Sequence, residues 1–100
     1  MTTQFDSKHD AITTGLYYEG RKDLSHDGEG KIKSLEEILK DPEIKIVDGN
    51  ISQFGYVHED TTMIEFKNSK DVLVKIATTK FRDGFDLWFI EPDSGAGMRV

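Results

Sequence analysis

The chain has 100 residues and no cysteine, and its 36% apolar and 32% charged residues are typical of one globular domain. This composition excludes a disulfide framework and thiolate chemistry. The net charge of −6 argues against direct nucleic-acid binding, because phosphate recognition needs clustered lysine and arginine. Residues 1–20, 21–50 and 51–100 each carry two more acids than bases, so the acidic excess is spread evenly. We therefore expect a single domain over residues 1–100.

The first third of the chain predicts a loose terminus, a strand and a loop. Residues 1–11 are mostly polar and contain neither a basic segment nor a long apolar one, which argues against secretion. Residues 12–19 alternate in the period of two that is typical of a half-buried strand. Residues 20–30 contain three glycines and no apolar period, and they predict a long loop.

Residues 34–42 predict one short helix. Ser34 is a suitable N-cap, and Glu37 stands at the capping-box position three residues later. Pro42 ends the helix, because proline cannot donate the intrahelical hydrogen bond.

The rest of the chain predicts strands joined by short polar turns. Residues 44–47 and 51–57 are expected to form a hairpin around Asp48-Gly49, a pair that favours a tight turn. Further strands are expected over residues 62–67, 72–79 and 85–90. Residues 92–100 are rich in glycine and predict a flexible tail. The predicted fold is α+β, with an antiparallel, meander-like sheet of five to six strands and one short helix packed on it.

The last hairpin has two predicted faces. A two-residue turn at Asp83-Gly84 places the apolar residues of both strands on one face, whereas a three-residue loop scatters them. With the two-residue turn, the shared apolar face carries Val72, Val74, Ile76 and Thr78 together with Phe85, Leu87 and Phe89. The opposite face is too apolar to be an ordinary solvated surface. The first strand or a partner is expected to cover it, unless the sheet curls into a small barrel. We therefore predict a binding surface formed by Leu73, Phe81, Trp88 and Ile90.

Residues 25–36 resemble an EF-hand calcium loop. Asp27, Glu29 and Glu36 stand at loop positions 3, 5 and 12, and Gly30 stands at position 6, where the family turns sharply. Position 1 is Ser25 where the family has aspartate, and no second copy of the motif occurs. The resemblance implies a Ca²⁺ site at Asp27, Glu29 and Glu36, and the alternative is a glycine-rich surface loop.

A second candidate for metal chemistry is Asp60 followed by the triplet Glu65-Phe66-Lys67. Carboxylates and a lysine in this order occur in metal-dependent nucleases and phosphodiesterases, where they hold Mg²⁺ and position a water. The alternative is a strand whose charged residues simply face solvent.

No catalytic motif stands out, and the size and acidity favour a binding module over an enzyme. We expect a small acidic cytoplasmic protein that binds another protein and modulates or inhibits it, of the viral or mobile-element inhibitor or immunity type. We expect neither membrane nor direct nucleic-acid partners, and no cofactor unless the loop binds Ca²⁺. The sequence leaves the oligomeric state open, with a homodimer as one alternative.

Overall fold

The structure, a computed structural model, describes residues 4–47, 52–53, 56–57, 59–90 and 97–99. Within these residues three helices precede the sheet: α1 Lys8–Tyr18, α2 Lys22–Ser25 and α3 Leu35–Leu39. The strands are β1 Lys45–Val47, β2 Ser52–Gln53, β3 Tyr56–Val57, β4 Glu59–Lys67, β5 Leu73–Phe81, β6 Gly84–Ile90 and β7 Gly97–Arg99. The α+β class and the antiparallel sheet are confirmed. The expectation of one short helix is wrong, because α1 and α2 form in addition to α3.

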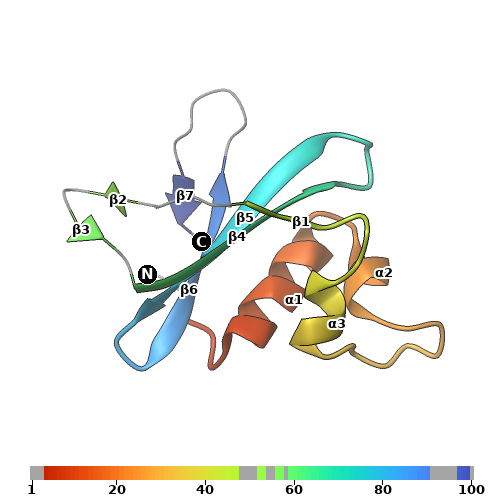
Figure 1. The fold of residues 1–100 in the computed structure, drawn as a ribbon, viewed down its shortest axis with the longest axis horizontal. Coiled ribbons are helices and arrows are strands. Elements are labelled where there is room, and N and C mark those ends of the chain that lie inside the picture. Colours follow the sequence, from red (N-terminus) through yellow and green to blue (C-terminus); the bar gives the residue numbers. More distant parts are fainter. Residues whose placement is uncertain (1–3, 48–51, 54–55, 58, 91–96, 100) are drawn as a thin grey trace.

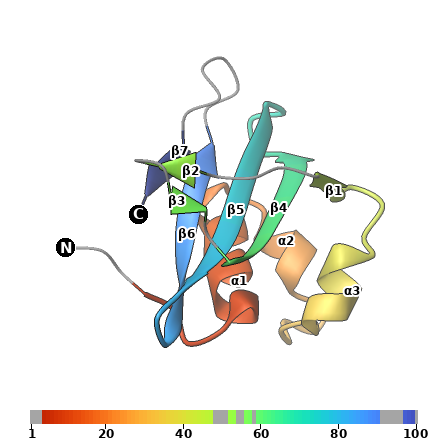
Figure 2. The same cartoon turned by 60° about the vertical axis from the view of Figure 1, so that its left-hand side comes forward.

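The strands are arranged in one main sheet with the order β1-β4-β5-β6-β7, and β2 and β3 pair separately. The helices lie together on one face of the main sheet (Figure 1). The β2–β3 pair lies on the opposite side, in front of β6 and β7 (Figure 2). The molecule therefore has a helical layer, a central sheet and a small third layer.

The predicted hairpin between residues 44–47 and 51–57 is wrong. β1 pairs with β4 instead, with Ile46 opposite Ile64, while β2 pairs with β3. The predicted turn residues Asp48 and Gly49 lie outside the described residues. A pairing across a longer stretch of chain has therefore replaced the local one.

Helix α1 occupies residues that were expected to be a loose terminus and a strand. Ser7 caps the helix, and its Oγ accepts a hydrogen bond from the backbone N–H of Asp10 at 3.1 Å. The buried face consists of Ala11, Ile12, Gly15 and Leu16. This spacing belongs to a helix, but two small residues on the face make the period hard to recognise in the sequence. Glycine at position 15 lets α1 approach β5 and β6 closely.

Both ends of the described chain are also paired with the sheet. Phe5 forms two backbone hydrogen bonds with Phe85, each of 2.8 Å, so residues 4–11 are not loose as predicted. At the other end, β7 pairs with β6 and places Met98 opposite Phe89. The remaining residues of the predicted tail, 92–96 and 100, lie outside the described residues.

The β5–β6 hairpin keeps the predicted faces but moves the turn by one residue. Phe81 pairs with Gly84, so the turn consists of Arg82 and Asp83, and Arg82 takes a positive φ of 59°. Gly84 is needed in the strand instead, because a Cβ there would lie 2.9 Å from the carbonyl oxygen of Phe5. Both turn positions give a register of the same parity, which is why the predicted faces remain correct.

The sheet has a separate core on each side. The larger one lies between the helices and the sheet, and its buried members are Ile12, Leu16, Leu24, Ile38, Ile44, Ile64, Phe66, Ile76 and Leu87. The smaller one lies on the opposite face, where Ala77 and Trp88 are buried and Met63 and Ile90 pack against them. The β2–β3 pair lies on this second side of the sheet (Figure 2).

Candidate functional site

The predicted calcium loop is a tight turn held by its own backbone. Asp27 Oδ1 accepts hydrogen bonds from the backbone N–H groups of Glu29, at 2.8 Å, and Lys31, at 2.9 Å. These two bonds, the one from Lys31 first, lower the pKa of the Asp27 carboxyl below its ordinary value. Ser25, at position 1 of the motif, is buried at the end of α2, where its hydroxyl donates to the Lys22 carbonyl.

A second predicted calcium ligand, Glu36, is directed elsewhere. Glu36 lies on α3, and its carboxylate forms an ion pair with Lys40, with Nζ and Oε1 2.9 Å apart. Among the described residues, no group of three or more His, Asp or Glu side chains is placed to hold one metal ion. The structure does not bring Asp27, Glu29 and Glu36 together, so the Ca²⁺ hypothesis stays a prediction without geometric support.

The predicted helix and its cap are present, because Ser34 Oγ accepts from the backbone N–H of Glu37.

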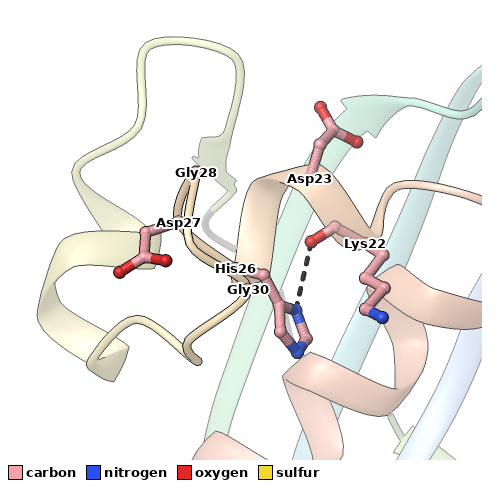
Figure 3. Close-up of a pocket in the computed structure, with 6 residues that line it drawn as sticks. All are labelled: Lys22, Asp23, His26, Asp27, Gly28 and Gly30. Carbon is pink, nitrogen blue, oxygen red and sulfur yellow. Dashed lines mark hydrogen bonds between the residues drawn. The ribbon is translucent and has the colours of Figure 1, made fainter.

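A shallow pocket of about 470 Å³ opens beside this loop, lined by Lys22, Asp23, His26, Asp27, Gly28 and Gly30. His26 Nδ1 lies 2.8 Å from Ser25 Oγ and 3.2 Å from the Lys22 carbonyl oxygen. Figure 3 shows the carboxylates of Asp23 and Asp27 pointing in different directions, away from the imidazole ring. The polar groups diverge, so the pocket holds no convergent binding site.

The backbone contacts of Asp27 predict how the loop responds to acid. Because its pKa is lowered on folding, the carboxylate stabilises the loop above the unfolded pKa of about 3.9, and this contribution is lost as pH falls through the lower folded value. We expect an NMR titration of Asp27 to show a midpoint below the ordinary pKa of aspartate. At pH values below that midpoint, the backbone amides of Glu29 and Lys31 should exchange faster with solvent.

Asp27→Asn is the matched control, since it keeps an oxygen acceptor but does not titrate. The variant should lose the pH dependence and retain slow amide exchange. A midpoint at or above the ordinary aspartate pKa would contradict the proposed role of the two backbone donors.

The predicted nuclease residues are each paired with a different charge. Asp60 Oδ1 lies 2.7 Å from Lys8 Nζ on α1, and Glu65 Oε2 lies 3.7 Å from Lys75 Nζ on β5. Lys67 pairs with Asp71 at 3.6 Å. Between Thr62 and Glu65 alone β4 rises roughly 10 Å, and Asp60 lies beyond the irregularity of the strand that precedes Thr62. The two carboxylates do not converge, so this arrangement gives the nuclease hypothesis no support.

The predicted binding surface is divided between a core and two separate surface positions. Trp88 is only 1% exposed, and its Nε1 donates to Thr79 Oγ1 at 2.7 Å. Leu73 is 49% and Phe81 39% exposed, but they lie at opposite ends of β5, roughly 26 Å apart by strand rise. Ile90 is half-buried against the second core. The four residues do not form one surface.

The structure instead exposes two neighbouring aromatic rings at the end of α1. Tyr17 is 63% and Tyr18 66% exposed. Their ring centroids are 6.1 Å apart, and the Tyr18 ring meets Phe89 of β6 nearly edge-on, with centroids 6.3 Å apart. The sequence analysis predicts a strand for both tyrosines. In the structure they lie on α1, and both point outward beside the buried Leu16.

No protein-family model, curated protein or solved structure matches this chain. Within the described residues, no helix has the length and apolar character needed to cross a bilayer. The candidate site is therefore defined by geometry alone: Tyr17, Tyr18 and Phe89, which we name the tyrosine surface.

Proposed function

We propose that the protein is a small binding module that modulates or inhibits a partner protein, and that the tyrosine surface contacts this partner. The observation that carries the proposal is the exposure of two adjacent tyrosines, each about two-thirds accessible. Tyrosine offers a large contact area with few rotatable bonds, which is why it is enriched in protein interfaces. Phe89 extends the apolar part of this surface onto the sheet.

The end of α1 is held firmly, which favours binding. The backbone N–H of Glu19 donates to the Gly15 carbonyl, and the backbone N–H of Ser69 donates to the Glu19 carbonyl, both at 3.1 Å. Gly20 packs directly against the Ser69 side chain at a positive φ of 75°. The turn between β4 and β5 thus braces the helix, so the backbone that carries the tyrosines loses little conformational freedom when a partner binds.

A rigid domain of this size can inhibit a partner by covering part of its surface. An inhibitor or immunity protein of a virus or mobile element is the proposed biological setting. The evenly distributed negative charge suits a partner protein better than nucleic acid.

Affinity capture with immobilised protein from a lysate of the host cells tests the proposal. We expect a specific partner to be retained by the natural chain, and the Tyr17→Ala/Tyr18→Ala variant to bind it at least about tenfold more weakly, because exposed tyrosines at interface centres are frequent hot spots. Titration calorimetry with the purified partner measures the change.

Ile32→Ala is the matched control, since Ile32 is an exposed apolar residue in the loop before α3. It should retain the partner with unchanged affinity. Equal retention by the tyrosine variant, or a chain that retains no protein, would contradict the proposal.

A further inference from the structure

The outer edge of β1 is a second feature with the properties of a binding site. In the described part of the main sheet, no strand follows β1. Ile46 at its centre is 56% exposed, although isoleucine on a strand is usually covered, and Lys45 is also exposed. In an antiparallel strand every second residue directs its N–H and C=O away from its neighbour. An edge of this kind can accept one more strand by backbone hydrogen bonding.

The adjoining part of the sheet edge is already occupied. β4 continues beyond β1 to Lys67, whose carbonyl oxygen accepts a hydrogen bond from the Arg21 guanidinium. Arg21 also pairs with Glu43 at 3.0 Å. Among the described residues, these contacts close the sheet edge next to β1 and leave Lys45–Val47 as the segment available to an added strand.

The register of the sheet specifies which strand would fit. On the face opposite the helices, Lys75, Glu65 and Lys45 lie side by side on β5, β4 and β1. The charges alternate across this row, and Glu65 forms an ion pair with Lys75 at 3.7 Å. Opposite charges on neighbouring strands stabilise their pairing, so the next position beyond Lys45 favours an acid.

A second row of side chains, on the face of the sheet that carries the helices, indicates which residue of an added strand would fit there. Ile76, Ile64 and Ile46 follow one another across β5, β4 and β1. The first two are buried and the third is largely exposed. An apolar side chain placed beyond Ile46 would extend this row and cover it.

We infer that the edge of β1 binds an extended segment of a partner protein, with an acidic side chain opposite Lys45 and an apolar side chain opposite Ile46. A recess of about 260 Å³ beside Lys45, also lined by Glu43 and Leu73, has room for one further side chain of that segment. A second copy of this chain is a poorer occupant, because Lys45–Val47 contains no acid to place opposite Lys45. The inference rests on the proposed protein-binding role but not on the tyrosine surface.

A peptide assay tests the site without the natural partner. The probe is a fluorescent seven-residue peptide that alternates valine and glutamate, and the comparison peptide has lysine in place of glutamate. We expect the glutamate peptide to bind about tenfold more tightly. Opposite charges on neighbouring strands stabilise their pairing, whereas like charges destabilise it. NMR shift changes should centre on Lys45, Ile46 and Val47.

Two variants and a control separate the edge from general charge effects. Lys45→Glu should reverse the preference between the two peptides, and Lys45→Gln should remove it. Lys80→Glu, at an exposed lysine on β5, should leave the preference unchanged. All three replace exposed side chains, and circular dichroism confirms that each is folded.

The inference is overturned if the peptides bind equally, if the shift changes lie away from β1, or if Lys45→Glu retains the natural preference. Dimerisation through β1 in place of peptide binding would also overturn it. Since Tyr17 and Tyr18 are unchanged in this assay, its failure removes the edge site alone, whereas failure of the lysate capture removes the tyrosine surface.

Discussion

Replacing Trp88 by alanine should lower the free energy of unfolding by roughly 3–5 kcal/mol. The indole is buried against Ala77, with Met63 and Ile90 packed around it, and its Nε1 donates to Thr79 Oγ1. The variant leaves a large cavity in this second core, and it leaves the buried Thr79 hydroxyl without its donor. Because Trp88 is the single tryptophan, urea unfolding must be followed by circular dichroism.

Leu73→Ala is the informative comparison, because Leu73 belongs to the same predicted surface but is about half exposed. Its effect on stability should be under about 1 kcal/mol, as is usual for exposed positions. Thr79→Val isolates the hydrogen bond and should cost about 1–3 kcal/mol, since the buried indole N–H loses its acceptor. A Trp88→Ala protein of near-natural stability would show that this face is a free surface and not a core.

The faces of the β5–β6 hairpin could be predicted because they depend only on a period of two. Both turn positions preserve that parity, so Ile76 and Leu87 fall on the same side even though the turn begins at Arg82. Helix α3 was also predictable, since its cap uses contacts within four residues, between Ser34 and Glu37. Such local rules do not need the rest of the fold.

Helix α1 could not be predicted in the same way, because local preference and tertiary packing disagree. Ile12, Thr13 and Thr14 are β-branched and favour a strand. The helix forms because its narrow face packs on the sheet and Ser7 caps it. The partners of that face lie far along the chain, on β5 and β6, which no periodicity in residues 8–18 could indicate.

The candidate site was missed for a related reason. The alternation in the sequence indicates that the face around Trp88 is too apolar for solvent, but it predicts the first strand, a partner or closure of the sheet into a barrel as the cover. The β2–β3 pair of this chain lies on that side instead (Figure 2). Once α1 is a helix and Trp88 is core, Tyr17 and Tyr18 become the most exposed aromatic side chains among the described residues.

The close packing of α1 on the sheet predicts an unusual outcome for Gly15→Ala. Alanine in a helix normally adds about 1 kcal/mol of stability relative to glycine. Here the new Cβ would lie 2.6 Å from Ile76 Cδ1 and 3.2 Å from Leu87 Cδ1, both inside the main core. Overpacking a core usually costs about 1–3 kcal/mol, so after subtraction of the helix-propensity gain we expect a net loss of up to about 2 kcal/mol in urea unfolding.

The second substitution Ile76→Val removes the Cδ1 atom that the new methyl group meets. Alone it should cost about 0.5–1.5 kcal/mol, but combined with Gly15→Ala it should recover stability, so that the double variant is less destabilised than the sum of the two single changes. Gly28→Ala serves as the control and should be nearly neutral, because no atom lies within 4 Å of the added Cβ. Simple additivity in the double variant would mean that α1 does not approach β5 at Gly15, and the orientation that exposes Tyr17 and Tyr18 would lose its main support.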